Sequence, residues 1–266
     1  MAALFTIPVP ALNQHAPGTI TCTSPAPLVY LLSISAPPDN RLTTATCTAL
    51  LTALDTIEFS HPPGVVLTTS ALPKFYSNGL DLEHALGTPT FLPQQLYRLF
   101  HRLLTYPMPT IAVLNGHAFA GGLMLAMHHD YRIMNPAKGF ACINELDFGV
   151  PLKPAMSSIF RIKTVPETYR KLVLEAHRFD GKAALAAGFV DGLGGVEEAV
   201  KFVEERKLTE KGKTGIYGLM KAEMYRESVD FLSEKGHYRE EERVLGMLDA
   251  DAERKEEGAK RIGAKL

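Results

Sequence analysis

One carboxylate stands alone in a mostly apolar stretch of the chain. Glu145 lies within residues 142–151, CINELDFGVP, where an acid exposed to water is unexpected. If its side chain is buried, loss of hydration raises the pKa and makes Glu145 a useful proton carrier near neutral pH. Two ordinary alternatives are that Glu145 caps the short helix that follows, or that it pairs with Lys153. Asp147 is a competing acid, but it shares a face with Glu145 only if the segment is extended.

A glycine-bearing turn upstream offers a free backbone N–H. Residues 116–122, GHAFAGG, follow a β-rich run at 110–114 and precede a helix-like run at 123–129. Because a helix N-terminus attracts negative charge, the N–H of Gly121 is a candidate anion-binding group. The segment is not a phosphate-binding P-loop, since Gly122 stands where that loop requires lysine. Close packing of helix on strand through small residues is the alternative, and both can hold.

A second candidate N–H follows another turn. Residues 75–83 read FYSNGLDLE, in which apolar anchors precede the turn signal Ser-Asn-Gly. Gly79 allows the chain to turn sharply, which leaves the N–H of Leu80 free to face a pocket. Taken alone, a plain surface turn is the commoner explanation, because such turns are frequent.

Other reactive residue types point to structural roles. His128 and His129 are neighbours on the predicted helix, about 100° apart, so they cannot both bind one metal ion. Core or interface histidine is therefore the better interpretation. The chain has no Gly-x-Ser-x-Gly motif, and none of its three cysteines has a nucleophilic setting. Asp130 ends the predicted helix, and we interpret it as a structural hydrogen-bond acceptor.

Composition limits the classes of partner. The 266 residues are 46% hydrophobic and include 28 basic and 29 acidic side chains. The balance of charge therefore gives no indication that the protein binds nucleic acid or a lipid surface. No apolar run reaches the roughly 18 residues of a membrane span. Widely spaced cysteines favour a reducing compartment. The last three residues, Ala264-Lys265-Leu266, resemble the Ser-Lys-Leu peroxisomal address, although a helical tail can end in Lys-Leu by chance.

The first half of the chain predicts a parallel sheet. Runs 29–35 and 65–69 read as buried strands on either side of a helix at 42–59, which makes a βαβ unit. Asp39 and Asn40 are candidate caps for that helix. Residues 1–27 have room for an edge strand, and residues 85–93 read as a mobile loop. Further runs predict a helix at 93–105 and strands at 131–134 and 140–143.

The C-terminal part is helical and highly charged. Residues 155–163 and 166–176 read as helices, and residues 201–266 hold 15 basic and 15 acidic side chains. Charges of both signs interspersed with leucine, methionine and tyrosine predict exposed amphipathic helices.

Taken together, these motifs resemble the crotonase (enoyl-CoA hydratase/isomerase) superfamily. The resemblance rests on residues 110–154, on FYSNGLDL at 75–82, and on the spacing F-x-G-x-x-A-x-x-x-G-x-V-D at 179–191. Within the superfamily it looks nearest to the peroxisomal Δ3,Δ2-enoyl-CoA isomerases of plants and fungi. This implies an α/β fold, the crotonase-like ββα superhelix, with a core domain at 1–200. It also implies a C-terminal helical region at 201–266 that forms a homotrimer or hexamer.

The resemblance assigns roles to residues. It implies that the N–H groups of Leu80 and Gly121 form an oxyanion hole and that Glu145 is the catalytic acid. Hydratases of the superfamily use a second glutamate, and Met124 occupies its place here, which favours a one-base proton transfer over hydration. Further substrate contacts are implied at Ser77, Asn78, Gly79, Phe119, Ala120, Leu123, Met124 and Phe148, with Val150 in the same apolar pocket.

The implied activity is isomerisation of 3-enoyl-CoA to 2-enoyl-CoA in the β-oxidation of unsaturated fatty acids. No metal or redox cofactor is required, because acyl-CoA is itself the substrate. The implied location is the peroxisome, reached through an import receptor that binds the C-terminus, with the cytoplasm as alternative. A hydratase or thioesterase of the same fold, or a non-catalytic acyl-CoA-binding protein, remains open.

Overall fold

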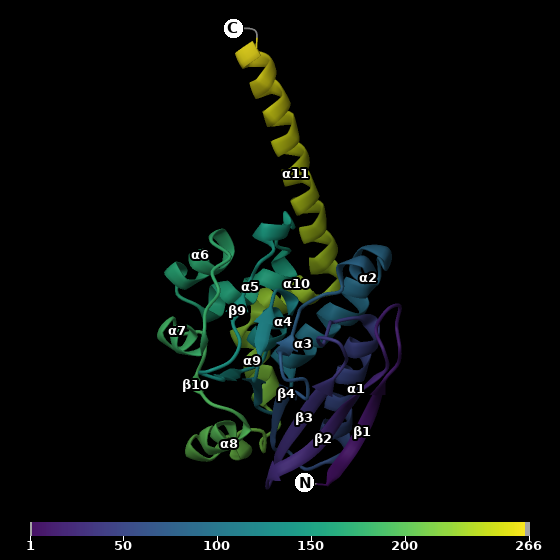
Figure 1. Ribbon diagram of the computed structural model, residues 1–266, viewed down its shortest axis with the longest axis vertical. Coiled ribbons are helices and arrows are strands. Elements are labelled where there is room, and N and C mark those ends of the chain that lie inside the picture. Colours follow the sequence, from purple (N-terminus) through teal and green to yellow (C-terminus); the bar gives the residue numbers. More distant parts are fainter. Residues whose placement is uncertain (1, 264–266) are drawn as a thin grey trace.

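The computed structural model describes residues 2–263 and is built on a large, mostly parallel sheet of seven strands (Figure 1). In spatial order the strands are β1 (Ala3–Val9), β2 (Gly18–Ala26), β3 (Val29–Ser35), β4 (Val65–Ser70), β6 (Thr110–Leu114), β8 (Tyr131–Met134) and β10 (Gly192–Leu193). The first three pair antiparallel, and the pairs from β3 to β10 are parallel. The edge strand expected within residues 1–27 is therefore two strands, with β1 at the edge.

A second, smaller sheet leads to the candidate site. Its three parallel strands are β5 (Phe75–Ser77), β7 (His117–Phe119) and β9 (Ala141–Cys142). Each small strand follows one strand of the large sheet, β4, β6 and β8 in turn, and a helical segment comes after it. This repeated strand–strand–helix unit is the ββα superhelix that the sequence motifs predict.

Helices cover the sheets and extend beyond them (Figure 1). They are α1 (Thr44–Ser60), α2 (Leu82–Gly87), α3 (Tyr97–Thr105), α4 (Gly121–His128), α5 (Pro154–Lys163), α6 (Pro166–Leu174), α7 (Gly181–Ala186), α8 (Val196–Glu205), α9 (Tyr217–Met224), α10 (Arg226–Leu232) and α11 (Glu234–Gly263). Shorter helical turns lie at Leu92–Leu96, Leu146–Phe148 and Leu208–Glu210.

The core forms where the large sheet meets α1, α3 and α4. Every residue of α4 is buried, so this helix is enclosed on all sides. The predicted inward face of the 93–105 helix is confirmed, because Leu96, Phe100, Leu103 and Leu104 are all buried. Helix α1 connects β3 to the parallel strand β4, which confirms the βαβ unit.

Three local predictions are wrong. Thr43 caps α1 by accepting a hydrogen bond from the N–H of Thr46, while Asn40 is buried and bonds to the backbone of Ala36. Residues 85–93 are not one long loop, because α2 extends to Gly87 and a helical turn begins at Leu92. The strand expected at 140–143 is only the two residues of β9.

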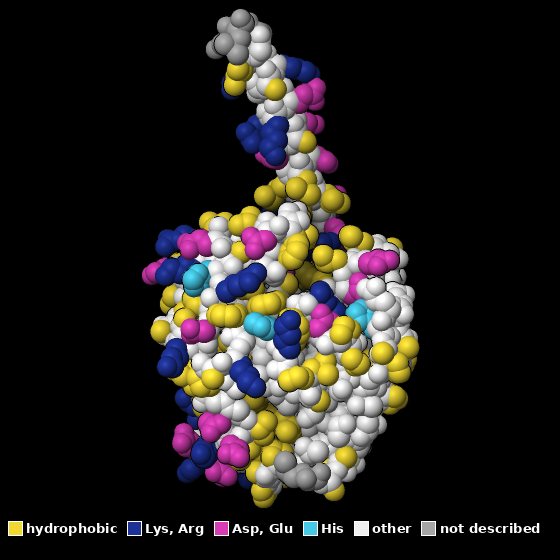
Figure 2. Space-filling model, viewed as in Figure 1, with side chains coloured by type: hydrophobic (Ala, Val, Ile, Leu, Met, Phe, Trp, Pro, Cys, Tyr) yellow, Lys and Arg dark blue, Asp and Glu magenta, His cyan; other side chains and the backbone are white. Residues whose placement is uncertain are grey.

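The last helix leaves the body of the molecule. Helix α11 has 30 residues, and most of its length projects away from the sheets (Figure 1). Side chains of both charge signs are interspersed along the projecting part (Figure 2), which confirms the prediction of exposed helices in this region. Hydrophobic side chains gather where α11 leaves the body (Figure 2).

Two findings concern membranes and metals. Between residues 2 and 263, no helix combines the length and the apolar character that crossing a bilayer demands. The same range holds no group of three or more His, Cys, Asp or Glu side chains placed to share a metal ion.

A buried ion pair attaches the C-terminal helices to the core. Lys221 on α9 lies 2.8 Å from Asp130, and both side chains are less than a tenth exposed. Asp130 also accepts a hydrogen bond of 2.9 Å from the N–H of Thr110, which confirms its structural role. Lys221 in addition donates to the carbonyl of Leu103 at 2.7 Å.

We expect Asp130→Ala to destabilise the fold strongly, because it leaves the Lys221 ammonium buried without its carboxylate. Removing one partner of a buried pair costs about 3–5 kcal/mol of unfolding free energy. Urea unfolding of the variant and the wild type measures this cost. Lys171→Ala, which breaks the exposed pair with Glu167, is the control and should change little. Equal losses in the two variants would contradict the assignment.

Candidate active site

The turn that precedes Leu80 is held from both sides. The hydroxyl of Ser77 donates to the carbonyl of Asn40 at 2.7 Å and accepts from the N–H of Gly79 at 3.2 Å. The Asn78 amide donates to Asp39 at 2.6 Å. Gly79 has a φ of +84°, a conformation that glycine adopts without strain. The turn is therefore a fixed element rather than a loose surface loop.

The peptide at Leu80 is fixed as well. The N–H of Leu42 donates to the carbonyl of Gly79, and the guanidinium of Arg41 donates to the carbonyl of Leu80, both at 2.8 Å. The N–H of Leu80 itself donates to no acceptor within residues 2–263. An anchored amide with a free hydrogen is available to a ligand.

The second amide belongs to the turn from β7 into α4. Ala120 has φ +49° and ψ −121°, a backbone conformation that side-chain-bearing residues rarely adopt and that costs roughly 1–3 kcal/mol. It is held by a 2.9 Å bond from its N–H to the carbonyl of Cys142 and by a 3.0 Å bond from the N–H of Met124 to its own carbonyl. This strained residue sets the direction of the Gly121 N–H, which also has no acceptor in the described part of the chain.

The two amides lie side by side. A Cβ built on Gly121 would be 3.3 Å from the nitrogen of Leu80, and a Cβ built on Gly79 would be 3.1 Å from the nitrogen of Gly121. Close packing also explains the glycines, since a Cβ on Gly122 would be only 2.2 Å from the carbonyl oxygen of Ser77. The close-packing interpretation of the glycine turn is therefore confirmed, and the Gly121 N–H remains a candidate anion-binding group.

Glu145 reaches the same region from β9. It follows Cys142 by three residues, and Cys142 pairs with Phe119 in the small sheet. Because the carboxyl ends of parallel strands lie at one edge of a sheet, Leu80, Gly121 and Glu145 each follow a strand at the same edge of the small sheet. The small sheet is therefore the element that positions the three predicted residues.

The Glu145 side chain is partly buried. Its Oε2 is buried and has no hydrogen-bond partner in the described residues. Burial raises the pKa of Glu145 to about 7, although the backbone N–H groups of Glu145 and Asn144 act in the opposite direction. A carboxyl with this pKa exchanges protons readily near neutral pH.

The ordinary alternatives for Glu145 do not hold. Its side chain makes no capping bond to the turn at Leu146–Phe148. Lys153 instead lies 2.6 Å from Glu241 on α11. Asp147 sits in the helical turn and is exposed, so it does not share a strand face with Glu145.

The predicted pocket residues divide into two groups. Leu123 and Met124 are buried in α4, while Phe119 and Ala120 are partly buried beside the two amides. Phe148 and Val150 are instead 64% and 39% exposed, so they do not shield Glu145 from water as expected. The short turn at Leu146–Phe148 is the reason, since it lies at the surface and contains no buried residue.

An open hollow lies beside the Glu145 segment. Its cavity volume is about 100 Å³, and it is lined by Tyr97, by residues 151 and 153–155, and by the first half of α11. Pro151 follows Val150, whose N–H donates to the carbonyl of Glu145 at 3.0 Å. Sequence reasoning missed this hollow because α11 carries no motif that places it there.

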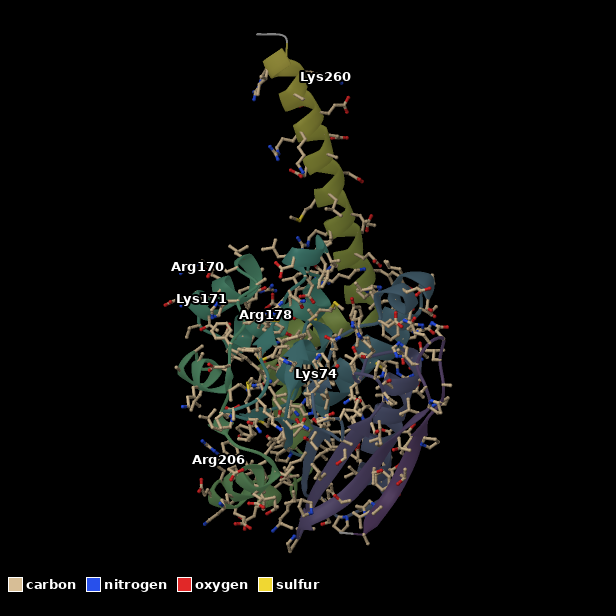
Figure 3. The ribbon with its side chains drawn as sticks, viewed as in Figure 1. Lys74, Arg170, Lys171, Arg178, Arg206 and Lys260 are labelled. Atoms are coloured by element: carbon tan, nitrogen blue, oxygen red, sulfur yellow. The ribbon has the colours of Figure 1, made fainter. Side chains whose placement is uncertain are left out.

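Two cations lie over the small sheet. Both Lys74 and Arg178 (labelled in Figure 3) lie near His117, whose pKa is lowered by burial and then by these two charges. The Lys74 ammonium is 5.2 Å from the ring of Phe75, and the Arg178 guanidinium is 5.7 Å from the ring of Phe119. Within residues 2–263 neither cation forms an ion pair with a carboxylate.

The two helix histidines are core residues, as the sequence indicates. His128 stacks on Phe100 with ring centres 4.0 Å apart, and His129 lies 2.9 Å from the hydroxyl of Thr68. Burial lowers the pKa of each to about 3, so both are neutral at physiological pH. Neither takes part in the candidate site.

Comparison with known proteins places this geometry in a family. The enoyl-CoA hydratase/isomerase family matches residues 28–261. Enoyl-CoA delta isomerase 3 of Arabidopsis thaliana is 31% identical, with 75% of this chain and 89% of that protein covered. The peroxisomal enoyl-CoA delta isomerase 1 of the same plant is 32% identical, with 75% and 87% covered.

A solved structure agrees with these relatives. The apo structure of an enoyl-CoA isomerase from Mycobacterium tuberculosis has a TM-score of 0.67 and 25% identity, with 80% of this chain and 96% of that chain covered. The resemblance to the crotonase superfamily and to its plant isomerases is therefore confirmed. The chain belongs to the enoyl-CoA hydratase/isomerase family, with the crotonase fold, and its kinship with the delta isomerases makes it an isomerase.

Proposed function

We propose that this enzyme converts 3-enoyl-CoA to 2-enoyl-CoA by moving one proton with a single glutamate. The thioester oxygen binds between the N–H groups of Leu80 and Gly121. Glu145 takes a proton from C2, and the electron pair of that C–H bond is delocalised as a dienolate. Glu145 then returns the same proton to C4, which leaves the double bond conjugated with the thioester. Atoms and charge balance without any added reagent.

The observation that carries this proposal is the Glu145 carboxyl, whose Oε2 is buried without a hydrogen-bond partner in the described residues. Burial raises the pKa of this carboxyl to about 7. A base must be ionised to take the proton, and the acid that results must give it back. Both steps are efficient when the pKa lies near the working pH. The two amides stabilise the dienolate oxygen, and each such donor is worth about 3–4 kcal/mol in comparable sites.

Isomerisation fits better than hydration, because hydration uses two acids around one water. The residue at the place of the second acid is Met124, which is buried and carries no proton. Helix α4 contains no carboxylate at all. A hydratase, a thioesterase or a binding protein of the same fold is the alternative, and product analysis with 3-enoyl-CoA and 2-enoyl-CoA separates them.

Charge and shape support a CoA thioester as substrate. CoA carries several phosphates, and Lys74 and Arg178 provide cations with no carboxylate partner in the described residues (Figure 3). We assign these two side chains to the phosphate-bearing end. We assign the mostly apolar hollow beside α11 to part of the acyl chain, because apolar side chains make up most of its lining and it lies next to the Glu145 segment.

Location and assembly belong to the same proposal. Two plant relatives are named as peroxisomal, which favours the peroxisome here. The address-like Ala264-Lys265-Leu266 lies outside the described residues. A homotrimer or hexamer built through residues 201–266 would cover exposed apolar side chains on α9, including Leu219 and Met224.

We expect Glu145→Gln to abolish isomerisation of trans-3-hexenoyl-CoA, because the amide cannot carry the proton. Formation of the conjugated thioester is followed by its ultraviolet absorbance. Binding of acyl-CoA, measured by calorimetry, should be retained, since the variant keeps the size of the side chain. Asp147→Asn, which changes an exposed acid in the same turn, is the matched control and should keep full activity. Substantial turnover by purified Glu145→Gln would refute the mechanism.

The pH profile should show the ionisation of Glu145. We expect kcat/KM to rise as the pH increases through about 7, because the free enzyme needs the carboxylate form. A limb centred near the ordinary glutamate value of about 4.3 would instead indicate a solvated carboxyl.

Fold stability should depend on pH in the opposite direction to kcat/KM: it should fall, rather than rise, as the pH increases through the pKa of Glu145. The folded pKa of Glu145 lies above its unfolded value, so its favourable contribution is present below pH 4.5 and is lost as the pH rises through about 7. We therefore expect Glu145→Gln to unfold at a higher temperature than wild type at pH 8. At pH 5 the two should be nearly equal. Calorimetric unfolding at both pH values tests this, and an equal difference at both would contradict the burial of the carboxyl.

A further inference from the structure

A histidine near the N-terminus reaches the loop that carries the Leu80 amide. The Nε2 of His15 lies 2.6 Å from Oδ2 of Asp81, and both side chains are largely buried. Asp81 is the residue directly after Leu80. The family match begins at residue 28, so this contact comes from a part of the chain that the family pattern does not describe.

The turn between β1 and β2 is built to present His15. Leu12 and His15 exchange two backbone hydrogen bonds of 3.1 and 2.9 Å. Asn13 between them has a φ of +51°, a left-handed conformation that asparagine tolerates better than most residues. His15 therefore comes from a closed, hydrogen-bonded turn rather than from a free tail.

Asp81 is bonded through both carboxylate oxygens. Its Oδ1 accepts the N–H of His84 at 3.0 Å and so caps α2, while its Oδ2 contacts His15. Burial acts to raise the pKa of Asp81, but the bonds from His84 and His15 outweigh it and lower the pKa. Asp81 is thus a carboxylate at neutral pH, and His15 fixes its orientation.

The restraints around Leu80 are distributed along the chain. On the N-terminal side of the Leu80 N–H, the carbonyl of Gly79 accepts a hydrogen bond from the N–H of Leu42. On its C-terminal side, the carbonyl of Leu80 accepts a hydrogen bond from the Arg41 guanidinium. Arg41 is a long side chain, about a third exposed, and it is shared with Asp39. The pair of His15 and Asp81 also lies on the C-terminal side of the Leu80 amide. Its contact distance is shorter, and its side chains are more buried, than those of the pair of Arg41 and Asp39.

We propose that His15 is a positioning residue for the oxyanion hole. Through Asp81 and the start of α2, it keeps the Leu80 N–H directed at the thioester oxygen, and it touches no substrate. The inference rests on the proposed function, because it assumes that this N–H stabilises the dienolate. Losing one donor outright costs about 10²–10³ in kcat, so loosening one of several restraints should cost about tenfold.

Four proteins test the role of His15: wild type, His15→Ala, His15→Gln and His61→Ala. The ring of His61 stacks on Phe5 and lies at a tilt against Tyr30, so it supports the same N-terminal strands through ring packing. With trans-3-hexenoyl-CoA, we expect His15→Ala to lower kcat about tenfold with KM nearly unchanged. His15→Gln keeps an N–H for Asp81 and should regain most of the loss. His61→Ala should keep the wild-type kcat.

Several outcomes overturn the proposal. They are an unchanged kcat in His15→Ala, an equal fall in His61→Ala, or no recovery in His15→Gln. The route through Asp81 is tested in an Asp81→Asn background, where adding His15→Ala should cause no further fall in kcat. A further fall as large as that in the wild-type background would show that His15 does not act through Asp81.

Hydrogen exchange separates this inference from the proposed function. In His15→Ala, amides of residues 78–87 should exchange faster than in wild type, while His61→Ala leaves them unchanged. If the wild-type enzyme failed to isomerise any 3-enoyl-CoA, the proposed function would fall, and exchange would still decide whether His15 holds the loop. Unchanged exchange in His15→Ala would overturn the positioning role whatever the turnover.

Discussion

The pairing of β7 with β9 is the contact on which the candidate site depends. One hydrogen bond, from the N–H of Ala120 to the carbonyl of Cys142, connects the turn that presents Gly121 with the segment that carries Glu145. Because a sheet fixes both the spacing and the direction of neighbouring strands, this bond sets where the acid lies relative to the amide. Strand β5 lies on the other side of β7 and adds Leu80. Three residues far apart in sequence are thus placed at one edge of the small sheet by the ends of three short strands.

Rigidity at this edge comes from contacts that leave little room. The strained backbone of Ala120 persists because hydrogen bonds on both sides over-determine it. Glycines at 79, 121 and 122 allow backbone to approach backbone at distances that a side chain would prevent. Groups that are held in place before a ligand arrives need no reorganisation when charge develops, which is why such rigidity serves the stabilisation of an anion.

The other end of α4 is anchored by buried charge. Lys163 donates to the carbonyls of Met127 and His129 at 2.7 and 2.6 Å, where the helix leaves its last acceptors unpaired. Asp130 follows at once and binds Lys221 from α9. Burial lowers the pKa of Lys163 well below its usual range. The helix that begins at the candidate site is therefore fixed at its C-terminus by residues from α5 and α9.

The amino-acid sequence was sufficient to predict the elements that local patterns specify. Strands β3, β4, β6 and β8 and helix α1 follow from apolar runs and turn residues, and the motifs around Leu80, Gly121 and Glu145 were sufficient to indicate the family and its reaction type. These signals are readable because each depends on residues close together in the chain, where periodicity and turn chemistry act directly.

The environment of those residues could not be read from the sequence. The unpaired Glu145 oxygen, the exposure of Phe148 and the course of α11 depend on how distant segments pack. His15 and Asp81 are 66 positions apart, and no local pattern marks either as the partner of the other. Burial and pairing of this kind are properties of the packed chain, because the free energy of a buried polar group is set by the neighbours that replace water.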